Sequence, residues 1–483
     1  MADSPAALAL GIDLGTSAVK VAVLSGEGAV VGSASAAFAT FSELPAQAEQ
    51  DPADWLDALG RAMAALAAEL SPRLADWRTR IAAIGLAGQL PTLVCCGAGG
   101  PVGRAITWQD GRADAFASRA IAAPERRALY RQTGMLVDGR YLGPMFHQHW
   151  LPRRREVTSV LSAKDYLAFA LTGERITDPS TAAGYAAYAL GAGGFDASLC
   201  ERWGLPLATL PSVRPAHAVA GALTRAGASL LGLPAGVPVT VGSADSVASA
   251  YAMAGLEEGI VCVTMGSSTV IIEAVREARL DPSMRYLVTP HVEPGWFGRE
   301  MDLLATGSGY GWLSGLFGWE TGELDRAAAT SVAGAHGLTF APYLGSGEQG
   351  ALWNPALRGE LRGLTLHHTR ADIARAFLEG VCFEIRRCVE VLSETSRVRG
   401  IVLGGHLVGE PSSLQLLTDV LGLPVRPFPE ASSAALGAAL GAIRGAAGGA
   451  PANLNGSRRE SVAPGPGSPQ YERLYAHYRA VAG

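Results

Sequence analysis

Cysteine is sparse in this sequence, and no two cysteines form a CxxC pair. Metal sites and disulfide scaffolds need cysteines that recur at short, regular spacings, so this distribution argues against both. We therefore expect reduced cysteines inside the core of a cytoplasmic protein. The six are Cys95, Cys96, Cys200, Cys262, Cys382 and Cys388.

Positive charge is also in short supply, with 39 lysines and arginines against 44 aspartates and glutamates in 483 residues. Proteins that bind nucleic acids or membrane surfaces usually carry an excess of basic residues, so neither partner is expected. The stretch Met1–Pro5 lacks the basic residues that open a secretory signal, and no run is long and apolar enough to span a bilayer. The sequence predicts a soluble cytoplasmic enzyme of two or three domains.

What the sequence does contain is one short pattern that occurs twice, over Leu8–Leu24 and over Gly259–Ile272. In both copies an apolar strand leads into a turn of glycine and hydroxyl residues, and a second apolar strand follows. Such turns let backbone N–H groups approach an anion closely, because glycine has no Cβ. The repeat predicts two related halves that hold a polyphosphate from both sides. The turn residues are Gly15, Thr16, Ser17, Gly266, Ser267 and Ser268.

An ordinary β-hairpin explains either copy taken alone, and that alternative stays open. Asp13 favours the phosphate interpretation, because it stands in the first apolar strand beside the turn. A carboxylate next to a phosphate site is best explained as a partner of Mg²⁺, which binds oxygen ligands and keeps much of its water shell. We therefore predict that Asp13 is the metal-binding residue. Lys20 is left outside the site, since a lysine three residues after the turn can simply point to solvent.

Strand-like runs alternate with alanine- and arginine-rich helical runs, which indicates an α/β architecture. The clearest helix begins at Pro52, behind the N-cap Asp51, and runs through Leu70. Further helices are expected over 164–173, 369–392 and 471–481, strands over 81–89 and 238–241, a strand entering Gly404, and a surface loop over 448–469.

Short motifs follow one another along nearly the whole chain. They include Gly11-Ile-Asp-Leu-Gly-Thr-Ser17, Ile84-Gly-Leu-Ala-Gly-Gln89, Trp108-Gln-Asp-Gly-Arg112, Lys164-Asp-Tyr-Leu167, Gly266-Ser-Ser268, Gly347-Glu348 and Leu378-Glu-Gly380. Each motif is weak by itself, but their joint order resembles the FGGY carbohydrate kinases, and within that family the xylulokinase-like branch.

The resemblance implies an α/β fold of two actin-like, ribonuclease-H-like domains hinged about a central catalytic cleft. The N-terminal domain, residues 1–243, is expected to bind the sugar and to carry the first phosphate hairpin, and the C-terminal domain, residues 244–483, to bind ATP. The implied activity is phosphorylation of a small ketose or sugar alcohol by ATP with Mg²⁺, and a pentulose such as xylulose is the expected substrate. A homodimer is a further expectation, because many relatives form dimers.

Asp245 follows the predicted strand 238–241 and is the residue on which the mechanism depends. Phosphorylating an alcohol requires a base that takes the hydroxyl proton as the phosphoryl group arrives, and a carboxylate within hydrogen-bond reach does this. The family has its general base at the matching loop position, so the resemblance assigns that role to Asp245. The alternative is a helix N-cap, which Asp-Ser before an apolar run also fits.

The sugar is expected beside Trp108, Gln109 and Asp110. A polyol needs carboxylate and amide groups for its hydroxyls and an apolar wall for its C–H face, and this run supplies all three. Gln89 matches a family position close to the sugar. The chain then reads Leu90-Pro91-Thr92 where the xylulokinase pattern has Met-His-Gly. The missing histidine contact leaves a tetritol, hexulose or deoxy-sugar open as the substrate.

The nucleotide is expected against two glycine-rich segments of the second half. Gly307 and Gly309 are predicted to lie on a loop that approaches the ribose and the phosphates. Gly404 and Gly405 keep part of a Gly-Gly-Gly-Ala turn whose bare backbone lies against adenosine in the family. For the next residue, His406, both stacking on adenine and an exposed loop position stay open.

Two functions from different classes share these features. One is the carbohydrate kinase, and the other is an actin-like ATPase with a binding or regulatory role and no sugar substrate. Asp245 together with Trp108 and Asp110 favours the kinase, because a nucleotide sensor needs the phosphate turns but has no use for a polyol pocket with a base beside it.

Overall fold

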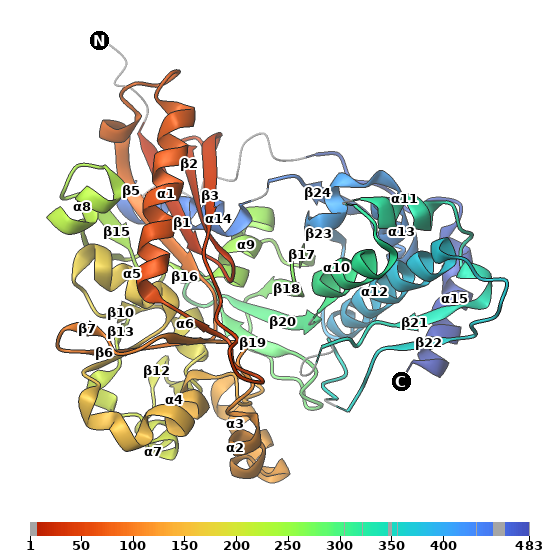
Figure 1. Ribbon diagram of the computed structural model, residues 1–483, viewed down its shortest axis with the longest axis horizontal. Helices are drawn as coiled ribbons and strands as arrows, with labels where there is room; N and C mark the ends of the chain where they lie inside the picture. Colours follow the sequence, from red (N-terminus) through yellow and green to blue (C-terminus); the bar gives the residue numbers. More distant parts are fainter. Residues whose placement is uncertain are drawn as a thin grey trace.

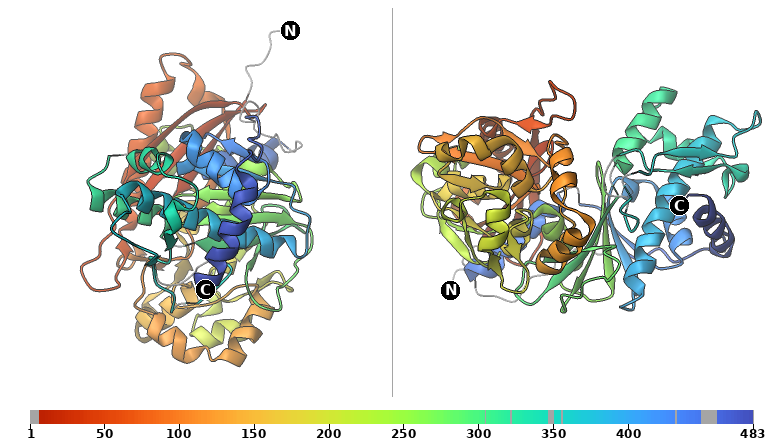
Figure 2. Two further views of the ribbon diagram at one scale, coloured as in Figure 1. Left: turned by 90° about the vertical axis from the view of Figure 1, so that its right-hand side faces the viewer. Right: turned by 90° about the horizontal axis from the view of Figure 1, so that it is seen from below.

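The computed structural model describes residues 7–303, 305–320, 322–345, 350–354, 356–430, 432–447 and 459–482. They form two lobes, which Figure 1 shows on the left and on the right. The right panel of Figure 2 shows the same lobes side by side, with the N-terminus at the first and the C-terminus on the second.

The first lobe is built on a seven-stranded sheet. Its main path runs β14 (Val219–Ala222), β15 (Pro238–Thr240), β5 (Ile81–Gly88), β1 (Leu8–Leu14), β2 (Ala18–Ser25) and β3 (Val30–Ala37), and β16 (Ser243–Ala244) also pairs with β5. The strands β1, β2 and β3 form an antiparallel meander. On the other side β1 pairs in parallel with β5, and β5 pairs in parallel with β15.

The second lobe repeats this plan in a six-stranded sheet. Its order is β19 (Leu287–Pro290), β20 (Phe297–Leu303), β18 (Thr269–Val275), β17 (Ile260–Met265), β23 (Gly400–Gly405) and β24 (Val425–Phe428). Here β17, β18 and β20 form the antiparallel meander, while β17 pairs in parallel with β23 and β23 with β24. Both predicted hairpins and the two related halves are therefore confirmed.

The predicted helices of the first lobe are present, because local signals and burial agree. The side chain of Asp51 caps α1 (Pro52–Leu70) by accepting a hydrogen bond from the amide of Ala53 at 2.9 Å. The apolar face of α1 packs against β2 and β3. The helix α5 (Ala163–Thr172) ends at Gly173, whose φ of 80° stops the helix in the left-handed region.

A smaller sheet extends the first lobe and positions Trp108. It contains β4 (Glu49–Gln50), β8 (Ala105–Thr107), β6 (Thr92–Gly97), β7 (Gly100–Pro101) and β9 (Ser159–Leu161). Its neighbours are α2 (Asp114–Ala120), α3 (Ala123–Thr133), α4 (Leu142–Trp150) and α7 (Ala197–Trp203), which share a core with large buried side chains such as Trp203. Trp108 directly follows β8 and so leaves the sheet at a strand end.

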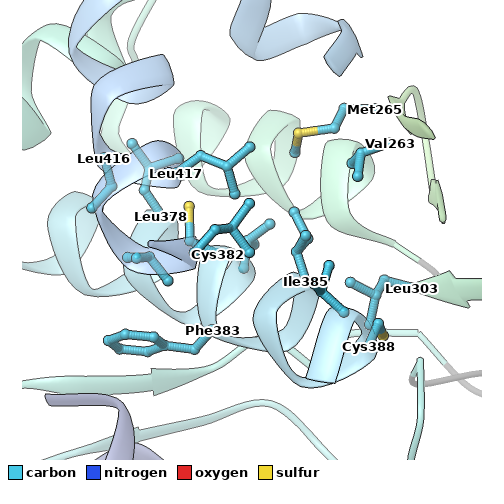
Figure 3. Close-up of a cluster of buried hydrophobic side chains, with 14 of the residues drawn as sticks. Val263, Met265, Leu303, Leu378, Cys382, Phe383, Ile385, Cys388, Leu416 and Leu417 are labelled. Atoms are coloured by element: carbon cyan, nitrogen blue, oxygen red, sulfur yellow. The ribbon is translucent and has the colours of Figure 1, made fainter. Parts of the chain in front are cut away.

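The core of the second lobe forms around α12 (Arg370–Ser393), which begins at its N-cap Thr369 as predicted. Figure 3 shows Leu378, Cys382 and Ile385 of this helix among the apolar side chains of the core. The helices α10 (Thr306–Phe317), α11 (Glu323–Ala329), α13 (Pro411–Leu421) and α15 (Ser468–Val481) complete the lobe. The last of these confirms the predicted terminal helix.

One helix of the C-terminal half, α14 (Ser433–Ala447), packs on the first sheet, where Figure 1 shows it in blue among the red and orange elements. Its backbone lies directly on β1 and β5, since a Cβ on Gly11 or on Gly85 would stand 1.8 Å from a carbonyl oxygen of α14. Only glycine permits so close an approach. Gly437 meets α9 (Asp245–Ala254) in the same way, at 1.9 Å. The helix therefore contacts both the first sheet and the helix that begins at Asp245.

Other expectations have mixed outcomes. All six cysteines are buried and unbonded, as predicted. Of the expected loop over 448–469, residues 448–458 lie outside the described part of the chain, and α15 already begins at Ser468. The motif Gly347-Glu348 also lies outside the described residues. Within the described part of the chain, every helix is too short or too polar to cross a membrane. The homodimer and the cytoplasmic location stay predictions.

Candidate active site

A cavity of about 150 Å³ brings residues of both lobes together. Thr16 from the first hairpin turn and Ser268 from the second line it, along with Trp108 and Asp245. Thr16 and Ser268 are half-buried, and Ser17 and Ser267 beside them are exposed. The two turns therefore present accessible hydroxyl groups near the same space, as the repeated pattern predicts.

Asp245 is the first residue of α9, and the N-cap is Ala244, which makes no side-chain cap. The alternative of a capping aspartate is therefore wrong. The Oδ1 atom of Asp245 accepts a hydrogen bond from the adjacent amide of Ser246 at 2.8 Å, and this is its only hydrogen bond among the described residues. Burial raises the pKa of Asp245 to about 8, and the negative charge of Asp13 adds to this effect. A carboxyl group with such a pKa is suited to accept a proton near neutral pH.

Asp13 lies in β1 and is only 3% exposed. Its Oδ1 has no hydrogen-bond partner among the described residues, and its Oδ2 lies 4.0 Å from the Nζ of Lys20. Burial raises the pKa of Asp13, and the cation of Lys20 only partly opposes this. Lys20, which the sequence analysis left outside the site, stands directly opposite Asp13 in the hairpin.

These contacts fit a cation at Asp13. A buried carboxylate oxygen without a partner is costly unless an ion or water satisfies it. The described residues contain no group of three or more His, Cys, Asp or Glu that could hold a metal by themselves. Asp13 would therefore bind Mg²⁺ with water and phosphate oxygens as the other ligands, which is the usual arrangement for this ion.

The segment with Gly307 and Gly309 forms the first turn of α10, so the prediction of a loop is wrong. This turn is fixed to the second hairpin, because the Ser308 amide donates to the Ser267 carbonyl at 3.1 Å. A Cβ on Gly307 would stand 1.9 Å from the carbonyl oxygen of Gly266, whereas a Cβ on Gly309 would meet Leu344 and the ring of the core residue Phe377. Gly307 therefore borders the second turn, and Gly309 faces away from it.

Gly404 and Gly405 end β23 beside the last residues of β17. Gly405 has a φ of 90°, and a Cβ there would lie 2.0 Å from the carbonyl oxygen of Met265. Its bare backbone is exposed, so the surface expected to lie against adenosine is accessible at this residue. The side chain of His406 lies outside the described residues, and both stacking on adenine and an exposed position stay open for it.

The four residues expected to bind the sugar separate in space. Trp108 lines the cavity with Asp245, while Gln109 and Asp110 line a neighbouring cavity of about 430 Å³ that Trp108 also borders. The Asp110 carboxylate is occupied by Arg112, with Nε–Oδ distances of 2.9 and 3.0 Å, and by the amide of Ala48. Asp110 therefore shapes the strand end, and a direct contact with sugar is not needed to explain its burial.

Gln89 is also buried and lines neither of these two cavities. Its Nε2 donates to Oε1 of Gln50 at 2.8 Å, and Gln50 Nε2 donates to the carbonyl of Thr16. This chain of contacts supports the first hairpin turn from behind. A role of Gln89 in sugar binding stays a prediction.

The sequence analysis did not identify several residues that line the cavity, among them Arg140, Ser180, Thr289, Glu300 and Asp302. Glu300 and Asp302 lie on β20, and the Thr289 hydroxyl donates to Glu300 at 2.6 Å. Two carboxylates at alternate positions of this strand, just before a glycine-rich segment, were the available signal.

The side chains that line the cavity determine which kind of molecule it can bind. Three of its described lining residues carry carboxyl groups, namely Asp245, Glu300 and Asp302. Arg140 also lines the cavity, and its guanidinium is bound to Asp138 at 2.6 Å. Hydroxyl groups such as that of Thr16 and apolar side chains such as those of Leu90 and Leu287 line other parts of it. The arrangement suits a small molecule with several hydroxyl groups and an apolar face.

Comparison with known proteins agrees with this geometry. The chain is 30% identical to the xylulose kinase of Escherichia coli K12 over 423 residues, 86% of this chain and 84% of that protein. It is 29% identical to a glycerol kinase of Gloeobacter violaceus over 433 residues, again 86% and 84% of the two chains. The solved structure of a xylulose kinase from Rhodospirillum rubrum superposes with a TM-score of 0.84 at 30% identity, covering 98% of both chains.

Family models divide the chain at the place where the second sheet begins. The model for the N-terminal domain of the FGGY family of carbohydrate kinases matches residues 8–252, and the model for its C-terminal domain matches residues 261–446. With two actin-like sheets and both domain models matched in order, this chain belongs to the FGGY family of carbohydrate kinases.

Proposed function

We propose that this chain transfers the γ-phosphoryl group of ATP to a hydroxyl of a small, neutral ketose or sugar alcohol. A pentulose such as xylulose is the preferred acceptor, and Asp245 is the general base. One observation carries the proposal: the Asp245 carboxyl group shares its cavity with Thr16 and Ser268, which belong to the two hairpin turns.

In this scheme the residues of the chain divide the work. Asp245 takes the proton of the acceptor hydroxyl, whose oxygen then bonds to the γ-phosphorus while the bond to ADP breaks. The two turns hold the phosphates, and Mg²⁺ at Asp13 supplies charge neutralisation for a highly anionic transition state. Trp108 covers the C–H face of the acceptor. The domain boundary between 243 and 244 is part of this proposal, because it assigns the acceptor to the first half and ATP to the second.

The charge of the cavity supports a neutral acceptor. An acceptor with its own carboxylate would meet the carboxyl groups of Glu300 and Asp302, and the cation of Arg140 is already engaged with Asp138. Like charges within a partly buried cavity repel strongly. Hydroxyl groups, in contrast, donate well to carboxylates. The proposal therefore favours ketoses and polyols over aldonates.

The similarity to both xylulose and glycerol kinases leaves the length of the acceptor to experiment. A coupled assay of ADP release over a panel of polyols, pentuloses, hexuloses and aldonates, each with and without Mg²⁺, tests the proposal. We expect Mg²⁺-dependent turnover with neutral acceptors, highest for a pentulose, and weak turnover with aldonates. Glu300→Gln should raise the KM of the best neutral acceptor and improve the relative turnover of aldonates.

Two results would contradict the proposal. Equal ADP release with and without every acceptor would favour the actin-like ATPase without a sugar substrate. A wild-type preference for aldonates over all neutral acceptors would reject the neutral class while retaining the kinase. Asp114→Ala is a matched control for Glu300→Gln, because Asp114 lines only the neighbouring cavity.

A further inference from the structure

Lys164 is a fully buried lysine in the first lobe, with 0% of its surface exposed. Its Nζ lies 2.9 Å from Oδ1 of Asp165 and 3.3 Å from Oδ1 of Asp178, and it donates to the carbonyl of Val241 at 3.0 Å. Burial lowers the pKa of Lys164, but the two carboxylates outweigh it and the pKa lies above its ordinary value. The ammonium group is therefore charged and satisfied inside the protein.

Asp178 connects Lys164 to Ser180. One of its oxygens, Oδ2, accepts hydrogen bonds from the Ser180 amide at 2.8 Å and from the Ser180 hydroxyl. Because the hydroxyl hydrogen points to Asp178, the Ser180 oxygen is free to accept, and it does so from the amide of Ala244 at 3.0 Å. A continuous chain of contacts thus runs from the buried lysine to the residue before Asp245.

The two attachment points enclose the segment that carries the proposed base. Lys164 holds the carbonyl of Val241, and Ser180 holds the amide of Ala244, which is the N-cap of α9. Between them Gly242 turns with a φ of 80°, and Ser243 pairs with β5. Asp245 follows directly, and it has no side-chain anchor of its own beyond the amide of Ser246 among the described contacts.

We infer that Lys164, Asp178 and Ser180 are positioning residues for Asp245: they fix the backbone from which its carboxyl group reaches the acceptor. The inference rests on the proposed function, since it takes Asp245 as the general base. A buried network of hydrogen bonds and ion pairs restrains the backbone that it holds, and displacing a reacting group by about 1 Å can lower a rate by about a hundredfold.

Ser180→Ala tests the inference because it removes only the hydroxyl that holds the Ala244 amide. We expect kcat to fall about ten- to a hundredfold, with the KM for ATP within about twofold of wild type. Ser249→Ala is the matched control, since Ser249 is a buried serine of α9 whose hydroxyl contacts Ser433 and not the network. The control should keep wild-type kcat.

Ser180 also lines the acceptor cavity, so a change in the KM of the acceptor is not diagnostic. A double-mutant cycle with Asp245 is diagnostic. If Ser180 acts through Asp245, then adding Ser180→Ala to Asp245→Asn should lower the remaining turnover by less than about twofold, because the base is already lost. A tenfold further loss would mean that Ser180 acts independently of Asp245 and would overturn the inference.

A folding defect is separated by circular dichroism and thermal melting of each variant. If Ser180→Ala does not fold, Asp178→Asn replaces it in the same cycle, because it keeps the side-chain shape while removing the charge that Lys164 binds. Wild-type kcat in a folded Ser180→Ala, with Asp245→Asn inactive, would refute the positioning role alone. Wild-type kcat in Asp245→Asn would instead refute the proposed base.

Discussion

The indole N–H of Trp108 donates a hydrogen bond of 3.1 Å to the hydroxyl of Thr16. A side chain proposed to cover the acceptor is thereby tied to the turn proposed to hold phosphate. Sequence reasoning placed Trp108 in the sugar pocket alone, whereas the ring borders both cavities of the cleft. Changes at Trp108 are therefore expected to affect the acceptor first and phosphate alignment second.

Substitution of Trp108 can separate these two effects. Trp108→Ala removes the apolar wall and should raise the KM of the acceptor about tenfold or more, with a smaller change for ATP. Trp108→Phe keeps an aromatic wall but loses the N–H that binds Thr16, so we expect a nearly unchanged acceptor KM and a kcat lowered a few-fold. Steady-state kinetics and calorimetry with each ligand measure the two affinities. A larger loss for ATP than for the acceptor in Trp108→Ala would reverse the assignment.

Asp245→Asn should lower kcat by about a hundredfold or more, which is the range for loss of a general base. Nucleotide binding should stay close to wild type, because the turns and the glycine-rich segments are unchanged. Single-turnover kinetics with the best acceptor measures the chemical step directly. Full activity in the variant would remove Asp245 from proton transfer.

The raised pKa of Asp245 predicts a pH dependence of defined sign. Since the base must be deprotonated and its pKa is about 8 in the free protein, kcat/KM should rise with pH and level off above about pH 8. The free energy of unfolding should change in the opposite direction and fall as pH rises. A carboxyl pKa raised in the folded state costs stability progressively as pH rises from about 4 to about 8.

Asp245→Asn abolishes this cost, so the variant should melt at a higher temperature than wild type near pH 8, with the difference shrinking toward pH 4. Thermal melts across this range, at constant ionic strength, measure it. A difference that stays constant across this range would show that the Asp245 carboxyl group ionises as an ordinary aspartate.

Asp13→Ala should change the metal dependence of the reaction more than its acceptor dependence. The substitution removes the buried oxygen that lacks a protein partner, so we expect the Mg²⁺ concentration for half-maximal activity to rise about tenfold. A Mg²⁺ titration at saturating acceptor and ATP tests this, with Asp114→Ala as the control carboxylate. An unaltered titration curve in Asp13→Ala would return Asp13 to a structural role.

Acceptor binding should bring the lobes together, because residues of both lobes line the cavity around Asp245. Closure would align the acceptor hydroxyl with the γ-phosphate and exclude water that otherwise causes wasteful hydrolysis. Small-angle scattering should show a smaller radius of gyration with a turnover-supporting acceptor than without it. A profile that stays the same at saturating acceptor would argue against hinge closure.

Features set by neighbouring residues were readable from the sequence. The helix behind Asp51 and both hairpins follow from caps, turns and strand patterns within short segments, and the repeat of the hairpin indicated the repeated sheet. The start of α10 was not readable, because glycines at 307 and 309 disfavour a helix locally. Contacts with the second hairpin, such as that between Ser308 and Ser267, override this preference.

The candidate site was predictable to a similar degree. Asp13 was found because it stands in an apolar strand beside the first turn, and Asp245 because it matches the loop position at which the family has its general base. Glu300 was missed, because it reaches the cavity only through the pairing of β20 with β18 and β19, which no local pattern encodes. Asp110 lies outside the Asp245 cavity and its carboxylate is bound by Arg112, a contact that residue spacing alone does not fix.

The position of α14 bears on the order in which the chain can fold during synthesis. The glycines of β1 and β5 on which it rests emerge from the ribosome early, whereas Ser433–Ala447 emerges near the end. The surface of β1 and β5 that α14 covers therefore stays exposed until residues 433–447 have been synthesised, although N-terminal domains usually fold first. A nascent chain released before this helix would expose apolar strand surface, so premature termination before Ser433 should yield an aggregating product and not a shortened enzyme.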